Sequence, residues 1–210
     1  MSTLHEPPKL KDIVILGQEH VLAGGVLVIP SQLSYFDLLH LEKFFQGRSV
    51  VYLSEKGADV VPLIKTHLQG ESVRVIEFDS SATEASGFAR AVQEETGKGS
   101  VVVYVPPTTA TQNAALSDIP GARLELLVKT GAPLQPLHIL HTNEVALAIE
   151  SPKPEGDAIF GFGPVLQRED ATVAGILESL MELAELCFSR NPILDRNLAY
   201  ALLQGLKRHG

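Results

Sequence analysis

The sequence predicts an α/β protein with a mostly parallel or mixed sheet, because strand-like and helix-like segments alternate along the chain. Two further observations favour one well-packed domain. The chain has 210 residues, which is enough for a sizeable core. Apolar residues make up 45% and charged residues 20%, which excludes a largely disordered chain. We predict a single domain over residues 1–210, with an α/β core at 11–168 and C-terminal helices at 169–210.

Short runs rich in β-branched and other apolar residues predict the strands. The two strands that end at Pro30 and Val105 are apolar along their length and are predicted to be buried. In chain order the predicted strands are 12–16, 25–30, 49–53, 73–78, 100–105, 135–140, 144–149 and 158–162.

Helices are predicted where apolar residues recur every three or four positions. Gly47, Gly70, Gly97 and Gly131 follow the ends of four of them, since glycine commonly lies just beyond a helix. A polar loop is expected at 106–118. The predicted helices are 36–46, 58–69, 82–95, one from near Pro120 to Lys129, 171–189 and 194–207.

Charge and cysteine content exclude several classes of protein. The chain has 17 Lys and Arg against 25 Asp and Glu, so its net charge of −8 disfavours nucleic acid, or an anionic membrane held by charge alone, as a partner. The single cysteine, Cys187, excludes an internal disulfide and a cysteine-rich metal site, and it fits a reducing cytoplasm. Cys187 lies on the apolar face of its predicted helix, which indicates a core residue rather than a nucleophile.

No segment of the sequence predicts a membrane span or a secretory leader. The longest apolar stretches, 21–30 and 101–107, are too short to cross a bilayer, and residues 1–11 contain no apolar leader core. Any membrane association is therefore expected to be peripheral.

Residues 24–37 form the most informative segment: a buried strand, a short loop that begins at Ser31, and the start of a helix that contains Asp37. This segment resembles the first motif of the glycerolipid acyltransferases, the family that includes 1-acylglycerol-3-phosphate acyltransferase. The family pattern is a strand followed by Asn-His-x-Ser-x-x-Asp. In that chemistry the His takes the proton of the acceptor hydroxyl, and the Asp orients the imidazole.

Later segments extend the resemblance in the same order. The strand 100–106 is similar to the one before the family's Phe-Pro-Glu-Gly-Thr-Arg loop. Residues 121–124, Gly-Ala-Arg-Leu, resemble a later Gly-x-x-Arg-Leu helix, and 129–137 resemble the Val-Pro-Val strand. Residues 162–166 and 206–209 are similar to the tail of a subgroup in which the acyltransferase is joined to an acyl-carrier-protein ligase and often to a transporter.

The resemblance implies a fold, substrates and a location. It implies a central mixed sheet flanked by helices, with two C-terminal helices. The acyl donor would be acyl-carrier protein or acyl-CoA, and the acceptor a lysophospholipid or glycerol phosphate, with no cofactor and no metal. It also implies a cytoplasmic protein at the inner face of the membrane, beside a partner acyltransferase, acyl ligase or transporter.

Two departures from the family pattern fall on its chemical groups. Gln32 stands at the position of the motif His, and a carboxamide cannot take a proton as imidazole does. The loop 106–110 is Pro-Pro-Thr-Thr-Ala, without the carboxylate, glycine and arginine that would hold an acceptor phosphate. Restoring the pair by Gln32→His should therefore give little activity unless that loop is rebuilt as well.

Each candidate residue also has a structural interpretation. Asp37 could be a capping acid in the first turn of its helix, and Gln32 could satisfy loop backbone rather than bind a ligand. The threonines fit an ordinary surface loop equally well. By the resemblance, the catalytic positions are Asp37 and Gln32, and the substrate-binding positions are Ser31, Ser34, Pro106, Thr108, Thr109 and Arg123.

None of the histidines is followed by Asp at the motif spacing, so the motif has not moved elsewhere. His40 lies one helical turn after Asp37 and could form a substitute pair with it. His138 and His141 face opposite sides of a predicted strand, so a shared metal is not expected, and one is expected to be packed and the other exposed. We therefore expect no His–carboxylate pair at the family position, and no metal, in the cleft.

The loops after Pro30 and Val105 are expected to face one cleft, as the corresponding loops do in the family. The first hypothesis for the function is a degenerate acyltransferase domain that binds acyl or lysophospholipid groups, or acts as a regulatory module. The alternative is an active acyltransferase with a rearranged site. A third hypothesis is an unrelated α/β domain.

Overall fold

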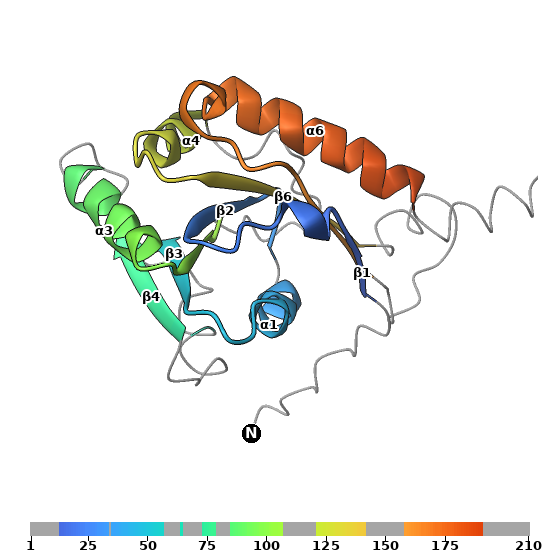
Figure 1. Cartoon of the computed structure of the whole chain (residues 1–210), viewed down its shortest axis with the longest axis horizontal. Helices are drawn as coiled ribbons and strands as arrows, with labels where there is room; N and C mark the ends of the chain where they lie inside the picture. Colours follow the sequence, from blue (N-terminus) through green and yellow to red (C-terminus); the bar gives the residue numbers. More distant parts are fainter. Residues whose placement is uncertain are drawn as a thin grey trace, which may run out of the picture.

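The computed structural model describes residues 13–33, 35–56, 64, 73–78, 85–106, 121–141 and 158–190. These residues form a seven-stranded sheet in the order β1-β7-β6-β2-β5-β3-β4. Neighbouring strands are parallel except β6 and β7, which are antiparallel. The sheet is flanked by helices, so the predicted fold class, an α/β domain with a central mixed sheet, is confirmed (Figure 1). The strands are β1 Ile13–Leu16, β2 Val26–Pro30, β3 Val50–Glu55, β4 Val73–Phe78, β5 Val101–Tyr104, β6 Leu134–His141 and β7 Ala158–Phe162.

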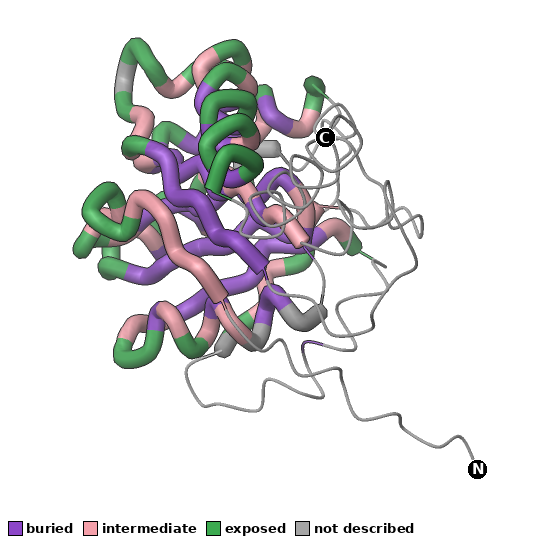
Figure 2. Tube along the Cα trace, turned by 90° about the vertical axis from the view of Figure 1, so that its right-hand side faces the viewer, coloured by how far each residue is buried: buried purple, intermediate pink, exposed green. Residues whose placement is uncertain are grey.

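Helices cover both faces of the sheet (Figure 1). Helix α1, Tyr35–Phe44, packs on one face through apolar residues such as Leu38 and Leu41. The other face is covered by α3 (Ala85–Gly97), α4 (Gly121–Val128) and α6 (Val173–Ser189). Because helices lie on both faces, β2 is buried along its whole length, as its uninterrupted apolar sequence requires. Figure 2 shows this buried centre, with exposed residues at the margin.

Most predicted elements lie within a few residues of their observed positions. The largest differences are β3, which continues to Glu55, and α3, which runs from Ala85 to Gly97. The short 3-10 turns η1 (Gln18–His20) and η3 (Arg168–Asp170) were not anticipated. Helix α6 is the first of the two predicted C-terminal helices. The second, 194–207, lies outside the described residues, as do helix 58–69 except Ile64, strand 144–149 and most of loop 106–118.

The direction of the chain changes at the centre of the sheet. After β2 the chain enters α1 on one face and returns as β3, whereas after β5 it enters α4 on the opposite face and returns as β6. Strands β2 and β5 are parallel neighbours, with Val28 opposite Val103. Ligands of open α/β sheets bind outside the carboxyl ends of the strands at such a point.

The amino end of β2 approaches the end of α3 closely. A Cβ atom added at Gly25 would lie 1.8 Å from the carbonyl oxygen of Thr96 in α3. A Cβ added at the preceding residue, Gly24, would meet nothing within 4 Å. Glycine at position 25 therefore allows α3 to pack directly on the start of the central strand.

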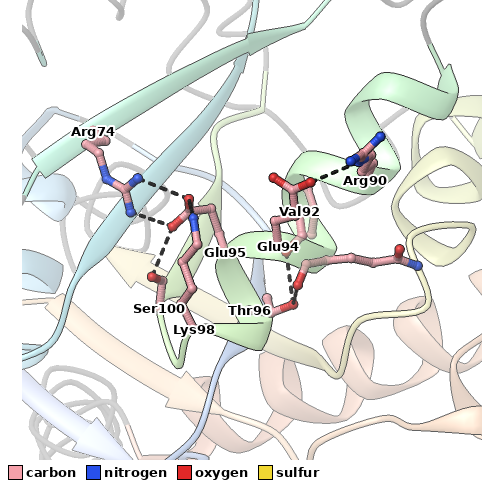
Figure 3. Close-up of polar contacts among 9 residues, drawn as sticks. Arg74, Arg90, Val92, Glu94, Glu95, Thr96, Lys98 and Ser100 are labelled. Carbon is pink, nitrogen blue, oxygen red and sulfur yellow. Dashed lines mark hydrogen bonds and ion pairs between the residues drawn. The ribbon is translucent and has the colours of Figure 1, made fainter.

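An ionic cluster around the buried Glu95 carboxylate joins the end of α3 to β4 and β5 (Figure 3). The Glu95 carboxylate accepts hydrogen bonds from both terminal nitrogens of Arg74 in β4. The distance from Nη1 of Arg74 to Oε1 of Glu95 is 3.0 Å, and Nη2 binds Oε2. Lys98 Nζ at 2.9 Å and the Ser100 hydroxyl at 3.1 Å complete the cluster. The Arg74 hydrogen bonds are the main reason that the pKa of Glu95 falls to about 2, against the opposing effect of burial. Glu95 is therefore charged wherever the protein is folded near neutral pH.

This cluster predicts a stability term that depends on pH. The pKa of Glu95 is lower in the folded protein than its ordinary value of 4.5, so the term is present above pH 4.5 and is lost as pH falls toward 2. Because Arg74 and Lys98 are half exposed, we expect Glu95→Gln to lower the free energy of unfolding at pH 7 by about 1–2 kcal/mol. The measurement is urea unfolding of wild type and variant between pH 7 and 3, over which their difference should shrink.

The neighbouring Glu94 offers a matched control. It makes an exposed ion pair with Arg90, so Glu94→Gln should change the free energy of unfolding by less than about 0.5 kcal/mol at any pH (Figure 3). Equal effects of the two substitutions would contradict the assignment of the pH-dependent term to Glu95.

Candidate active site

The predicted site residues that the structure describes lie at the carboxyl edge of the sheet. Ser31 and Gln32 directly follow β2, Asp37 lies in the first turn of α1, and Pro106 follows β5. The last residue of β6, His141, lies at the same edge because β6 runs parallel to β2. The loops after Pro30 and Val105 thus begin on neighbouring strands, while residues 107–120 lie outside the described residues.

Asp37 is fully buried and is paired with an imidazole. The Nε2 atom of His141 lies 2.8 Å from Oδ1 of Asp37. The His141 side chain keeps 22% of its surface exposed, whereas Asp37 has none. A buried carboxylate requires a hydrogen-bonding partner, and His141 supplies one while reaching the surface itself. The pair therefore has the arrangement of an imidazole oriented by a carboxylate.

Strand alternation explains why His141 reaches Asp37. Leu137 and Ile139 belong to the same buried cluster as Leu38 of α1, so they point to the α1 face of the sheet. Alternate residues of a strand share a face, which places His141 on that face too. Helix α1 presents Asp37 there from its first turn.

The end of β6 is held by the two residues that follow β2. The Ser31 backbone N–H donates to the carbonyl of Leu137 at 2.8 Å. Beyond this, the Ile139 N–H donates to the Ser31 hydroxyl oxygen at 3.2 Å. The Gln32 side-chain amide donates to the Ile139 carbonyl at 2.8 Å.

Two expectations from the sequence are wrong. We expected no imidazole at Asp37, but His141 binds it. We expected one packed and one exposed residue in His138 and His141, but both are half-buried. The signal that could have found His141 was its alternation with Leu137 and Ile139.

The predicted substitute pair of Asp37 with His40 does not form among the described residues. The imidazole that is hydrogen-bonded to Asp37 belongs to His141. Burial lowers the pKa of His40. The nearby Asp37 raises it, and Lys43 lowers it further. His40 is therefore a weaker base than an ordinary histidine, and the hydrogen bond to Asp37 is made by His141 instead.

The remaining predicted site residues are not part of the pair formed by Asp37 and His141. Ser31 is buried, and Pro106 is half-buried. Arg123 of α4 pairs with Glu55 at the end of β3, with Nη2 2.8 Å from Oε2 and Nε also in contact with the carboxylate. Helix α4 packs on the face opposite α1, and Arg123 is paired with Glu55 rather than with Asp37. Ser34, Thr108 and Thr109 lie outside the described residues.

The described part of the chain has few other features that indicate function. There, no cluster of three or more His, Cys, Asp or Glu residues has the arrangement needed to hold a metal ion. No described helix combines the length and the apolar character needed to cross a bilayer. Cys187 is buried against the sheet, and burial raises the pKa of its thiol to about 11, which agrees with its predicted role as a core residue.

Comparison with known proteins identifies a fold. No family model matches the chain, and a search of curated proteins finds no match. Among solved structures, the chain is similar to the 1-acyl-sn-glycerophosphate (LPA) acyltransferase PlsC from Thermotoga maritima. The TM-score is 0.54 at 16% sequence identity, over 83% of this chain and 72% of that one. The chain therefore has an acyltransferase-like fold, as the resemblance implied.

Proposed function

We propose that this protein is an acyltransferase that uses His141 and Asp37 in place of the motif pair. It would transfer an acyl group from a thioester donor, acyl-carrier protein or acyl-CoA, to a hydroxyl of a lysophospholipid-type acceptor. The observation that supports this proposal best is the 2.8 Å contact between His141 and the fully buried Asp37. The alternative of a rearranged site is thereby favoured over a site without a base.

The proposed reaction follows from the chemistry of the pair. His141 takes the proton of the acceptor hydroxyl as its oxygen attacks the thioester carbonyl carbon. The new C–O bond forms, the C–S bond breaks, and the proton passes to the leaving thiolate. Because Asp37 binds Nε2, the proton would enter and leave at Nδ1, and the buried carboxylate would stabilise the imidazolium.

The position of the pair and the likeness to a known structure give further support. Asp37 follows β2 at the centre of the sheet, where β2 and β5 send their connections to opposite faces. Open α/β sheets bind their ligands at such a point. The similar solved structure is that of an acyltransferase for 1-acyl-sn-glycerophosphate, which motivates the proposed acceptor class.

A second candidate function is a binding or regulatory module without turnover. Two observations favour it. Loop 106–110 contains no charged residue that could hold an acceptor phosphate, and Arg123 is already engaged by Glu55. Such a module would bind the same acyl and lysophospholipid groups, beside a partner acyltransferase, acyl ligase or transporter. In either case we propose peripheral contact with the cytoplasmic face of a membrane.

Acyl transfer by the purified full chain separates the two functions. We expect an ester product and an equal amount of free thiol when acyl-CoA or acyl-carrier protein is mixed with lysophosphatidic acid, because the dyad supplies the base that the reaction needs. Lysophosphatidylcholine and glycerol 3-phosphate, assayed in parallel, define the acceptor. Binding of donor and acceptor in a calorimeter without release of thiol would favour the module and contradict the proposed enzyme.

A further inference from the structure

The strand that contains His141 extends beyond the end of its central neighbour. The last register pair between β2 and β6 is Pro30 with Leu137. Strand β6 then continues for four residues to His141. Antiparallel pairing with β7 supports these residues on one side, from Leu137 to His141. On the β2 side, the last backbone hydrogen bond among the described residues is the one from Ser31 N–H to the Leu137 carbonyl.

Two side chains continue this ladder. The Ser31 hydroxyl accepts from the Ile139 N–H, and the Gln32 amide donates to the Ile139 carbonyl, at 3.2 and 2.8 Å. The two groups have the polarity that the next residues of a parallel strand would have presented. Ser31 is buried, and Gln32 is half-buried, so neither bond is readily replaced by water.

We infer that Gln32 and Ser31 are positioning residues, which hold the end of β6 so that the imidazole of His141 stays on Asp37. This inference rests on the proposed function for its effect on catalysis. Asp37 is fixed by α1 and His141 by β6, so the distance between them depends on how these elements sit relative to each other. The two side chains that follow β2 bind the backbone of Ile139, two residues before His141.

The consequence for turnover follows from geometry. A misplacement of about 1 Å at a reacting group can cost on the order of 100-fold in rate. Pairing with β7 keeps β6 in the sheet when the two side-chain bonds are removed, so the loss should appear in the position of His141 rather than in folding. Gln32, at the position of the motif His, would thus position the base His141 and would not itself act as a base.

Replacing Gln32 by the motif histidine has a different expected effect in this structure. The sequence suggested that Gln32→His would restore the motif pair, even if with little activity. In the structure, that substitution removes the donor to Ile139, and His141 already occupies Oδ1 of Asp37. We therefore expect Gln32→His to lower acyl transfer.

The decisive variant is Gln32→Met, which keeps the length of the side chain and removes the donor. We expect kcat to fall about 10- to 100-fold, with KM changed less than about two-fold, because the substrate groups are untouched. A second readout is independent of activity: the NMR signal of the His141 imidazole N–H, assigned by its loss in His141→Asn. In Gln32→Met and Ser31→Ala this proton should exchange faster with solvent. Gln167→Met, at an exposed glutamine far along the chain, is the matched control and should change neither readout.

The outcomes separate this inference from the proposed function. If wild type is active and neither kcat nor the imidazole signal changes in Gln32→Met and Ser31→Ala, the inference is overturned while the function stands. If wild type shows no turnover, the proposed function fails, and the imidazole signal alone decides: faster exchange supports the positioning role of Gln32 and Ser31, and unchanged exchange overturns it. Higher activity of Gln32→His that does not require His141 would also overturn it. Urea unfolding of each variant identifies any loss that comes from folding.

Discussion

Replacing His141 by Asn is expected to lower kcat for acyl transfer by about 10²- to 10⁴-fold, the usual contribution of a positioned general base. Asparagine leaves a polar side chain beside Asp37 but has no basic nitrogen, so proton transfer is lost. Asp37→Asn should have an effect of the same order, because the imidazole then loses the charge that orients and stabilises it. Initial rates of thiol release from the acyl donor, at saturating lysophospholipid, measure both.

His138→Asn is the matched control, since it makes the same change on the same strand but on the opposite face of the sheet. It should leave kcat close to that of wild type. Added imidazole should restore part of the activity of His141→Ala, and it should not restore that of Asp37→Ala. Wild-type turnover in His141→Asn would show that another group takes the proton, and it would remove the basis of the proposed mechanism.

Gly25→Ala is expected to lower the free energy of unfolding by about 2–4 kcal/mol, a large share of the stability of a typical domain. The added Cβ would lie 1.8 Å from the backbone oxygen of Thr96, and a backbone atom cannot move aside as a flexible side chain can. Relief requires α3 to shift away from β2, which disturbs the packing of Val92 and Phe88 on the sheet. Urea unfolding followed by circular dichroism measures the change.

Gly24→Ala tests the cause, because it makes the identical chemical change one residue earlier, where a Cβ meets nothing within 4 Å. It should change the free energy of unfolding by less than about 1 kcal/mol. Similar losses in the two variants would point to the backbone flexibility of the glycine pair instead of the contact with Thr96.

The strands could be predicted from the sequence because the local signal and the tertiary environment agree. Buried parallel strands have uninterrupted apolar runs, as in 26–30 and 101–104, and glycines such as Gly131 mark helix ends. Asp37 could be found as well, since a motif with fixed spacing surrounds it. These features depend on residues that are near one another in the sequence.

The partner of Asp37 could not be found in that way. His141 is 104 residues away in the chain, and only the parallel pairing of β2 with β6 brings the two together. The role of Gln32 could not be predicted from the sequence either. Its chemistry excludes a base, but whether its amide meets a ligand, its own loop or a neighbouring strand depends on how far β6 extends beyond β2.

The place of β1 in the sheet has a consequence for how the chain reaches this structure. Among the described strands β1 lies at an edge and pairs with β7, so Ile13 has no strand neighbour until Ala158 has been synthesised. Strands β3 and β4, by contrast, are joined through residues 56–72, a far smaller separation in the chain. During synthesis at about 5–20 residues per second, the first strand therefore stays unpaired for many seconds while the centre of the sheet can already assemble. Closing that long loop makes the addition of β1 a late and slow step, and the exposed edge of β7 is the surface on which misfolding would begin.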